Sequence, residues 1–247
     1  MPRYFIEVFY KGEGFSGFQV QPNANTIQSE IEKAFQIFFR RSVSLTGSSR
    51  TDAGVHALQN YFHFDWDDNI SVDTLYNLNA ILPSGIVLKS INEVKPDAHC
   101  RFHASAREYK YYINGFKNPF LDDRAWYLPY ALNKDLLDDC AASIKQSIDF
   151  IAFSKRNTQV KSFDCAIFES NWITENDCLI YQVKANRFLR GMVRGLVGTM
   201  IRVARGKMTF ENFQSLFKES NQATADFSAP SKGLFLVSVA YPKDLFL

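Results

Sequence analysis

The stretch GSSRTDAGVHAL, residues 47–58, places Arg50, Asp52 and His56 among glycine, serine and alanine residues that are too small to build a packed core. A single aspartate in such a loop is most often a turn residue or a helix cap. Here Arg50 precedes Asp52 by two residues, and its positive charge should keep the carboxylate ionised. An ionised carboxylate without a metal cluster, a Cys–His pair or a Ser–His pair suits nucleophilic or base chemistry on an electrophilic carbon. Asp52 is therefore a candidate catalytic group.

Cysteine and histidine residues give little indication of a metal site. The four cysteines are widely separated, so neither a zinc knuckle nor a disulfide framework is suggested. His99 and His103 lie four residues apart beside Cys100, as two metal ligands on a helix would, but the ligand set of a zinc site is incomplete. An ordinary polar segment ahead of a strand explains these residues better. We therefore predict no metal.

Composition and charge indicate a globular chain with a polyanionic partner. The 247 residues are 46% hydrophobic and include 23 Phe and 11 Tyr, enough to bury a sizeable core. The net charge is only +2, yet residues 178–210 contain seven Lys or Arg and no acid, an asymmetry that favours a polyanion as partner. The sequence shows no membrane span and no signal-peptide pattern, so we expect a cytoplasmic protein with no membrane partner.

The pattern of apolar residues predicts an α+β chain in which one order of elements occurs twice. The first half reads as strand, helix, two strands, helix and strand, which is typical of a split βαβ, ferredoxin-like unit. Its strands are expected at 4–10, 43–49, 58–65 and 85–94. Its first helix is expected to start at Asn25 or Thr26, with Gln28 in a capping box, and its second helix is expected at 71–83. The second half repeats the order at 107–116, 133–146, near 163–169, at 178–185, from about 187, and at 233–242. We predict an N-terminal domain of residues 1–103 with the aspartate loop, and a C-terminal domain of residues 104–247.

Residues 186–205 predict an amphipathic helix with Asn186 as N-cap and one strongly basic face. Five arginines fall within an arc of about 120°, and three glycines project onto the same side. Each glycine inside a helix costs about 1 kcal/mol relative to alanine. Because glycine removes bulk where a phosphate backbone could approach, and guanidinium groups suit phosphates, we predict contact with nucleic acid. A solvated or subunit-facing stripe is the alternative. The arginines are Arg187, Arg190, Arg194, Arg202 and Arg205.

The segment SRTDAGVHAL resembles the G-R-T-D-A-G-V-H-A signature of the TruA-type tRNA pseudouridine synthase family, with Ser49 where the family usually has glycine. Four more blocks resemble the family in the same order and together extend over essentially the whole chain. The first of them has Lys11 in place of aspartate and Phe18 in place of tryptophan, which puts local loop shape in question. The blocks are FYKGEGFSGFQVQPNANTIQSEIEKAF, FHASAREYKYYI, KANRFLRGMVRGLVG and APSKGLFLVSVAYP.

The resemblance implies two ferredoxin-like (RRM-like) halves that share a continuous antiparallel sheet flanked by helices, and a homodimer with a cleft for tRNA. It implies that uridine is isomerised to pseudouridine at positions 38, 39 and 40 of the anticodon stem-loop, without cofactor or metal. Position in the motifs implies that Asp52 is the catalytic aspartate and that Arg194 pairs with it. Tyr109 would stack on the target base, and Arg50 would lie beside the target nucleotide and help it leave the stack.

Three further basic residues, Lys184, Arg187 and Arg190, are RNA-contact candidates only, because the family varies around them.

Two rival functions remain open at this point. A non-catalytic RNA-binding protein with ferredoxin-like domains would also use aromatic strands and basic helices. A metal-dependent or glycosidase-type hydrolase would need a second acid and would release uracil or shortened RNA. The available acids, Asp65, Asp67 and Asp68, have the sequence context of a turn at a strand end.

Overall fold

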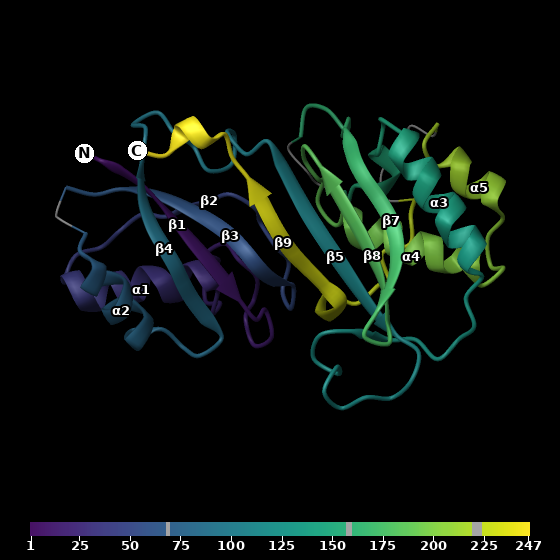
Figure 1. Cartoon of the computed structure of the whole chain (residues 1–247), viewed down its shortest axis with the longest axis horizontal. Helices are drawn as coiled ribbons and strands as arrows, with labels where there is room; N and C mark the ends of the chain where they lie inside the picture. The colour runs from purple at the N-terminus through teal and green to yellow at the C-terminus, as the bar shows by residue number, and fades with distance from the viewer. Residues whose placement is uncertain (68–69, 157–159, 219–223) are drawn as a thin grey trace. The chain divides into compact units, whose positions relative to one another are not determined.

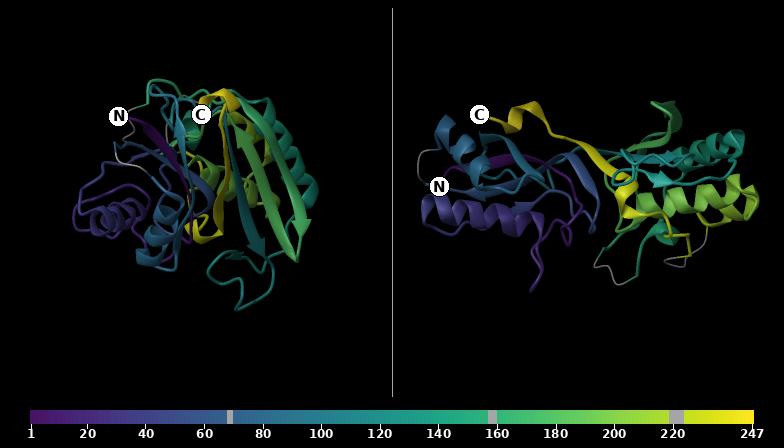
Figure 2. Two further views of the ribbon diagram at one scale, coloured as in Figure 1. Left: turned by 60° about the vertical axis from the view of Figure 1, so that its left-hand side comes forward. Right: turned by 90° about the horizontal axis from the view of Figure 1, so that it is seen from below.

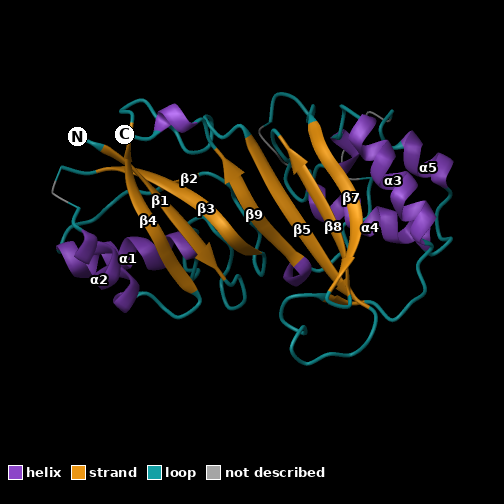
Figure 3. Cartoon of the chain, viewed as in Figure 1, coloured by secondary structure: helices purple, strands orange, loops and turns teal. Residues whose placement is uncertain are grey.

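The computed structural model describes residues 1–67, 70–156, 160–218 and 224–247. Within these ranges nine strands and five α-helices form two compact units, Met1–Ser105 with Phe235–Leu247, and Ala106–Leu234 (Figure 1). Most strand pairs are antiparallel, so the predicted α+β class is confirmed (Figure 3). None of the described helices is long and apolar enough to cross a membrane.

The first unit is built on a sheet of ferredoxin-like order. β1 (Arg3–Tyr10) lies between β3 (His56–Asp65) and β4 (Ile86–Val94) and is antiparallel to both. The two-residue β2 (Thr46–Gly47) pairs with the later part of β3, which gives the order β4-β1-β3-β2. β9 (Leu234–Ala240) is parallel to the start of β3. β3 therefore begins beside the last strand of the chain, just after the Asp52 loop.

Two helices complete this unit. α1 (Ile27–Phe39) begins after Thr26, whose hydroxyl accepts the Ser29 backbone N–H at 3.2 Å. Ser29 completes the capping box, so the predicted role of Gln28 is wrong; the Gln28 amide instead donates to the Leu45 carbonyl at 2.9 Å. α2 (Val72–Ile81) packs against α1 and β4.

The second unit repeats the first part of the same order. β5 (Ala106–Asn114) is antiparallel to β8 (Cys178–Ala185), which is antiparallel to β7 (Ile167–Glu175). A short strand, β6 (Trp126–Tyr127), runs parallel to the end of β5. The order β5-β8-β7 corresponds to β1-β3-β2 of the first unit, as the repeated pattern predicts.

The helices of the second unit pack on one another, on one side of its sheet (Figure 2), and the first of them packs on β7. α3 (Lys134–Gln146) begins after Asn133, whose side chain accepts the Leu136 N–H at 3.1 Å. α3 contacts β7, and it also contacts α4 (Met192–Ala204) and α5 (Phe210–Ser215). Most residues of α4 are buried, and Arg194 lies on this helix.

Several boundaries differ from the prediction. The sequence placed 233–242 in a C-terminal domain, whereas Phe235–Leu247 belongs by its contacts to the first unit. β7 begins at Ile167, later than the expected 163, and β2 is shorter than the expected 43–49. β2 ends at Gly47, two residues before the expected end, because Ser48 and Ser49 already belong to the loop that leads to Asp52. β6 and α5 were not predicted.

Candidate active site

Asp52 lies in a tight loop of the first unit, between β2 and β3. Its carbonyl accepts the Val55 N–H at 3.2 Å, and Gly54 has a φ of 76°. Residues 52–55 thus form a β-turn whose third position requires a left-handed conformation, which glycine adopts without strain. Asp52 is half-buried and Arg50 is exposed. The small residues of the signature therefore hold the carboxylate in a defined turn while leaving it partly open to solvent.

Buried polar groups fix the backbone on both sides of Arg50. The Tyr10 hydroxyl lies 2.7 Å from the Thr51 hydroxyl. The amide of Asn60, which is fully buried, donates to the Ser49 carbonyl at 2.9 Å and to the Tyr10 hydroxyl at 3.2 Å. Sequence analysis did not single out Asn60; its signal is an amide directly before the aromatic pair Tyr61 and Phe62 in the middle of a strand. Such satisfied buried polar groups specify one backbone arrangement.

The glycine-rich segment after β1 packs directly on the Asp52 loop. A Cβ on Gly12 would lie 2.1 Å from the Val55 carbonyl oxygen, so only glycine permits this approach. The Gly12 N–H donates to Nδ1 of His56 at 3.2 Å. The His56 ring is 2% exposed and stacks on Phe235 with centroids 4.5 Å apart. His56 therefore holds the base of the loop.

The three residues that depart from the family pattern all have defined surroundings in the structure. Phe18 stacks on Phe62 with ring centroids 4.3 Å apart, and its N–H donates to the Thr51 carbonyl at 3.1 Å. Ser49 is buried, and Lys11 is exposed and pairs with Glu13 at 3.3 Å. The backbone of Phe18 is therefore bonded to the Asp52 loop, whose shape these substitutions had put in question.

Tyr109 lies on β5 of the second unit, opposite Val183 on β8. It is 8% exposed, and its ring meets that of Phe188 edge-on, with centroids 5.0 Å apart and planes at 85°. Edge-to-face packing fixes the orientation of an aromatic ring. Tyr109 is therefore held rigidly by its strand and by one aromatic neighbour, and it is more buried than a freely exposed stacking platform.

Arg194 lies on α4 of the second unit, and the backbone after α5 positions it. Its Nε donates to the Ala229 carbonyl at 2.7 Å, and one terminal nitrogen lies 3.5 Å from the Phe227 carbonyl. Arg194 is half-buried. The guanidinium donates and the carbonyl oxygens accept, so these two contacts fix the orientation of the Arg194 side chain.

The continuous basic helix predicted over 186–205 is wrong at its start. α4 begins at Met192 after Gly191, which has a φ of 76° and interrupts helical backbone. Asn186 is not its N-cap: the Asn186 side chain accepts the Ala166 N–H at 2.9 Å. Arg187 and Arg190 therefore lie in the turn between β8 and α4, away from any helical stripe. The hydrogen bond between Asn186 and Ala166 extends the contact between the end of β8 and the segment before β7. This contact competes with helix formation at Asn186.

The helix glycines also have a different role from the predicted one. A Cβ on Gly195 would lie 3.0 Å from the Phe227 ring, and one on Gly198 would lie 2.3 Å from the Asp226 carbonyl oxygen. Both glycines are buried. The space that they leave is filled by the chain's own residues 226–227, so the interpretation of these glycines as room for phosphate is wrong.

The other basic residues are distributed over the second unit. Lys184, on β8, lies 3.6 Å from Glu169 and is half-buried. Arg190 is exposed, Arg187 is half-buried, and Arg205 stacks over Tyr130 with its guanidinium carbon 3.7 Å from the ring centroid. The structure therefore brings Arg50 and Asp52 together in one unit and places Tyr109, Arg194, Lys184, Arg187 and Arg190 in the other.

The acids considered for a glycosidase are engaged elsewhere. Asp65 pairs with Arg3 at 2.7 Å, and Asp67 pairs with Arg41 at 2.7 Å. Asp68 lies outside the described residues. Neither described acid contributes to the Asp52 loop.

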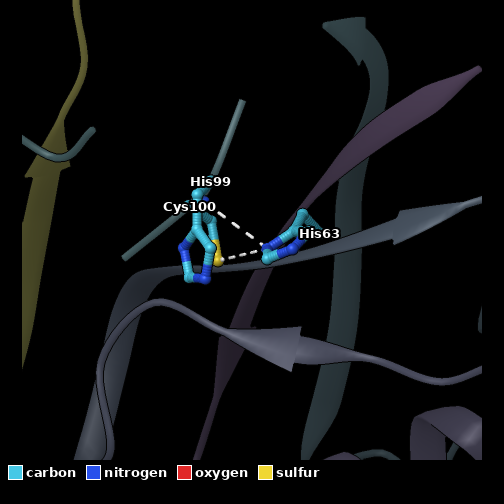
Figure 4. Close-up of side chains that lie close together, drawn as sticks. All are labelled: His63, His99 and Cys100. Carbon is cyan, nitrogen blue, oxygen red and sulfur yellow. Dashed lines mark hydrogen bonds between the residues drawn. The ribbon is translucent and has the colours of Figure 1, made fainter. Parts of the chain in front are cut away.

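His63, His99 and Cys100 form a compact group beside β2 (Figure 4). One ligand atom from each lies within 4.8 Å of the others, a spacing that a metal ion could bridge. However, His99 Nδ1 accepts the Arg101 N–H at 3.1 Å, and the Cys100 thiol donates to the Thr46 carbonyl at 3.1 Å. A metal-bound histidine normally donates through its second nitrogen. The group therefore fits a metal poorly, and the absence of a metal stays a prediction.

The same group positions the strand that leads into the Asp52 loop. His63 Nδ1 lies 3.2 Å from the Cys100 sulfur, and both residues are almost fully buried. The Tyr241 hydroxyl contacts Ser48 Oγ at 3.0 Å and donates to the Cys100 carbonyl at 2.5 Å. Sequence analysis missed Tyr241, because nothing in the sequence shows that a residue so near the C-terminus packs on this loop.

Comparisons with known proteins agree over nearly the whole chain. A family model described as tRNA pseudouridine synthase matches residues 147–242. The tRNA pseudouridine synthase A of Parabacteroides distasonis is 41% identical over 248 residues, which cover 100% of this chain and 98% of that protein. The protein of the same name from Bacteroides thetaiotaomicron is 41% identical, with 100% and 93% covered. That from Staphylococcus aureus strain MRSA252 is 34% identical, with 96% and 91% covered.

Proposed function

The chain belongs to the tRNA pseudouridine synthase family, and on this premise we propose that it converts uridine to pseudouridine at positions 38, 39 and 40 of the tRNA anticodon stem-loop. As a member of this family it is an isomerase that acts on uridine in tRNA. The reaction breaks the N1–C1′ bond, turns the uracil and forms a C5–C1′ bond. The proton lost from C5 is balanced by one gained at N1, so the product has the mass of the substrate.

The observation that carries the proposal is the Asp52 loop. Its carboxylate is half-buried in a β-turn whose backbone is held by Tyr10, Asn60 and Gly12. A negative charge so held can act on the sugar or the base without a cofactor, provided that its position is fixed beforehand. Arg50, two residues away and exposed, is the group proposed to help the target nucleotide leave the stack.

The second unit supplies the other proposed partners. We assign Tyr109 to stack on the target base, supported by the ring orientation that β5 and Phe188 fix. We assign Arg194 to pair with Asp52, supported by its position in the motif and by the Ala229 carbonyl, which orients its guanidinium. Lys184, Arg187 and Arg190 are proposed to contact the RNA backbone. We also propose that the enzyme is a cytoplasmic homodimer that needs neither metal nor cofactor. A sheet continuous through both halves would carry the site.

Carbodiimide mapping of tRNA incubated with the purified protein tests the function. The expected result is a carbodiimide-dependent stop of reverse transcription at positions 38, 39 or 40, with no change in the mass of the RNA. The rival functions give different results. A binding protein leaves uridine unmodified, and a hydrolase releases uracil or shortens the RNA. Either result would contradict the proposal.

A further inference from the structure

A pocket of about 310 Å³ opens beside the Asp52 loop, entirely within the first unit. It is lined by residues of the segment after β1, of β2, and of the turn at 98–103, together with Arg50. Arg50 and Arg101 both contribute to it, and none of the described residues that line it is acidic. The lining therefore has the charge to receive an anionic group, and guanidinium groups match a phosphate in shape as well as charge.

An aromatic ring lies at the same pocket. Phe102 is 73% exposed, and its ring is 4.2 Å from that of His99, centroid to centroid. The Arg101 guanidinium carbon lies 5.8 Å from the Phe102 ring centroid. A phenylalanine so exposed beside arginines is a combination that proteins use to stack an unpaired base while they hold its phosphate.

The turn that presents these side chains is rigid. The His99 carbonyl accepts the N–H groups of Phe102 and His103 at 3.1 and 3.0 Å. The His99 N–H donates to His103 Nδ1 at 3.0 Å, and Cys100 is fixed through His63 and Tyr241. The imidazoles and the thiol thus hold the backbone from inside, while Arg101 and Phe102 are exposed. Rigid presentation lowers the entropy lost when a ligand binds.

We propose that this pocket binds a nucleotide flanking the target uridine, with its phosphate between Arg50 and Arg101 and its base against Phe102. This inference rests on the proposed function for the identity of the RNA. It assigns to the turn 98–103 a specificity role that the Asp52 chemistry does not require. The pocket would hold the RNA strand next to the nucleotide that is extruded, so it would contribute to binding equally before and during the reaction.

Crosslinking tests the proposal directly. Anticodon stem-loop RNAs would carry a single 4-thiouridine at each position within about three nucleotides of the target, with the target itself unchanged. After irradiation with the full-length protein, mass spectrometry would identify the peptide joined to each RNA. We expect one of these positions to label a peptide that contains Arg101 or Phe102. Labelling confined to other peptides would overturn the proposal.

Two variants give a quantitative test with a matched control. Phe102→Ala should weaken binding of the stem-loop about tenfold and raise KM without lowering kcat at saturating RNA, because the contact is uniform. Arg101→Gln should reduce the slope of log affinity against log salt by about one. Tyr76→Ala, which removes a ring 76% exposed on α2, should change neither quantity.

The outcomes distinguish this inference from the proposed function. Wild-type affinity and salt slope in both variants would overturn the pocket even if the wild-type protein makes pseudouridine. A wild-type protein that makes no pseudouridine, but still crosslinks through Phe102, would overturn the proposed function and leave the pocket as an RNA site. Phe102→Trp should restore the affinity lost in Phe102→Ala, because a larger ring stacks at least as well.

Discussion

Tyr109 packs within its own unit, and it is also the residue that we propose to stack on the target base. Its ring is 8% exposed and held edge-on by Phe188, so its orientation is set before RNA arrives. The role proposed for it needs only the face of the ring. The hydroxyl and the ring can therefore be separated by substitution.

We expect Tyr109→Phe to keep the stacking contribution and Tyr109→Leu to lose it. Stacking is worth about 1–3 kcal/mol per base, which corresponds to a loss of about 5- to 150-fold in kcat/KM for the leucine variant. Steady-state tritium release, with circular dichroism as the control for folding, measures this. A leucine variant that folds and keeps wild-type kcat/KM would remove Tyr109 from the proposed role.

His63 makes stability depend on pH. Burial, followed by the nearby positive groups His99 and Arg3, lowers the pKa of His63 from 6.5 to about 4. The unfolded chain therefore takes up a proton between pH 6.5 and 4 that the folded chain does not. The free energy of unfolding should therefore decrease as the pH is lowered from 6.5 to 4. The contribution of this residue is at most about 1.4 kcal/mol per pH unit.

Urea unfolding of the wild type and of His63→Gln between pH 4 and 7.5 measures this contribution. Burial also lowers the pKa of His99, and the carboxylates titrate in part of the same range, so the slopes are compared between the two proteins. We expect the smaller slope in His63→Gln. Equal slopes would show that His63 is protonated as readily in the folded protein as in the unfolded chain.

At the scale of elements, the Asp52 loop depends on two segments distant in sequence. The segment after β1 packs on it through Gly12, and Tyr241, directly after β9, contacts the side chain of Ser48, directly after β2. The loop is therefore the meeting point of three parts of the chain within one unit. Its geometry should respond to changes that touch neither Asp52 nor Arg50.

Gly12→Ala should lower activity through this contact. The added methyl group would lie 2.1 Å from the Val55 carbonyl oxygen, so the loop must shift, at a cost of about 1–3 kcal/mol in stability. Gly115→Ala is the matched control, because nothing lies within 4 Å of its Cβ and its φ is not in the left-handed region. Thermal unfolding and tritium release of both variants test this; equal losses in the two would contradict it.

The sequence predicted most elements because alternation and apolar periodicity are local properties. β1, β8 and α3 were predicted nearly at their observed bounds, and the Asp52 loop was identified from residue types alone. The predicted start of α4 was wrong because the hydrogen bond between Asn186 and Ala166 is a tertiary contact that overrides helix propensity. Asn60 and Tyr241 could not be identified as supports of the loop, since their roles arise only from residues far away in the sequence.

At the scale of the whole molecule, charge is distributed unevenly along a chain with a net charge of only +2. The basic residues 178–210 belong to the second unit, and several are already engaged by neighbouring carbonyls, rings or acids. Affinity for RNA should therefore come from a few exposed cations, more than from a uniform basic surface.

We expect log affinity for tRNA to fall linearly with log salt. Each phosphate contact contributes about 0.7–0.9 to the slope. Arg190→Gln should reduce the slope by about one. The control Arg124→Gln should leave it unchanged, because Asp123 lies 2.7 Å from that guanidinium. Filter binding from 50 to 300 mM salt measures the slopes. A flat dependence in the wild type would contradict binding through phosphates.

The central claim is that the Asp52 carboxylate carries the isomerisation, and Asp52→Asn tests it most directly. The substitution keeps the volume of the side chain and removes its charge. With tRNA tritiated at C5 of uridine, we predict that release of tritium is abolished while the affinity for tRNA stays within about twofold of wild type. An asparagine variant that releases tritium at the wild-type rate would contradict the account.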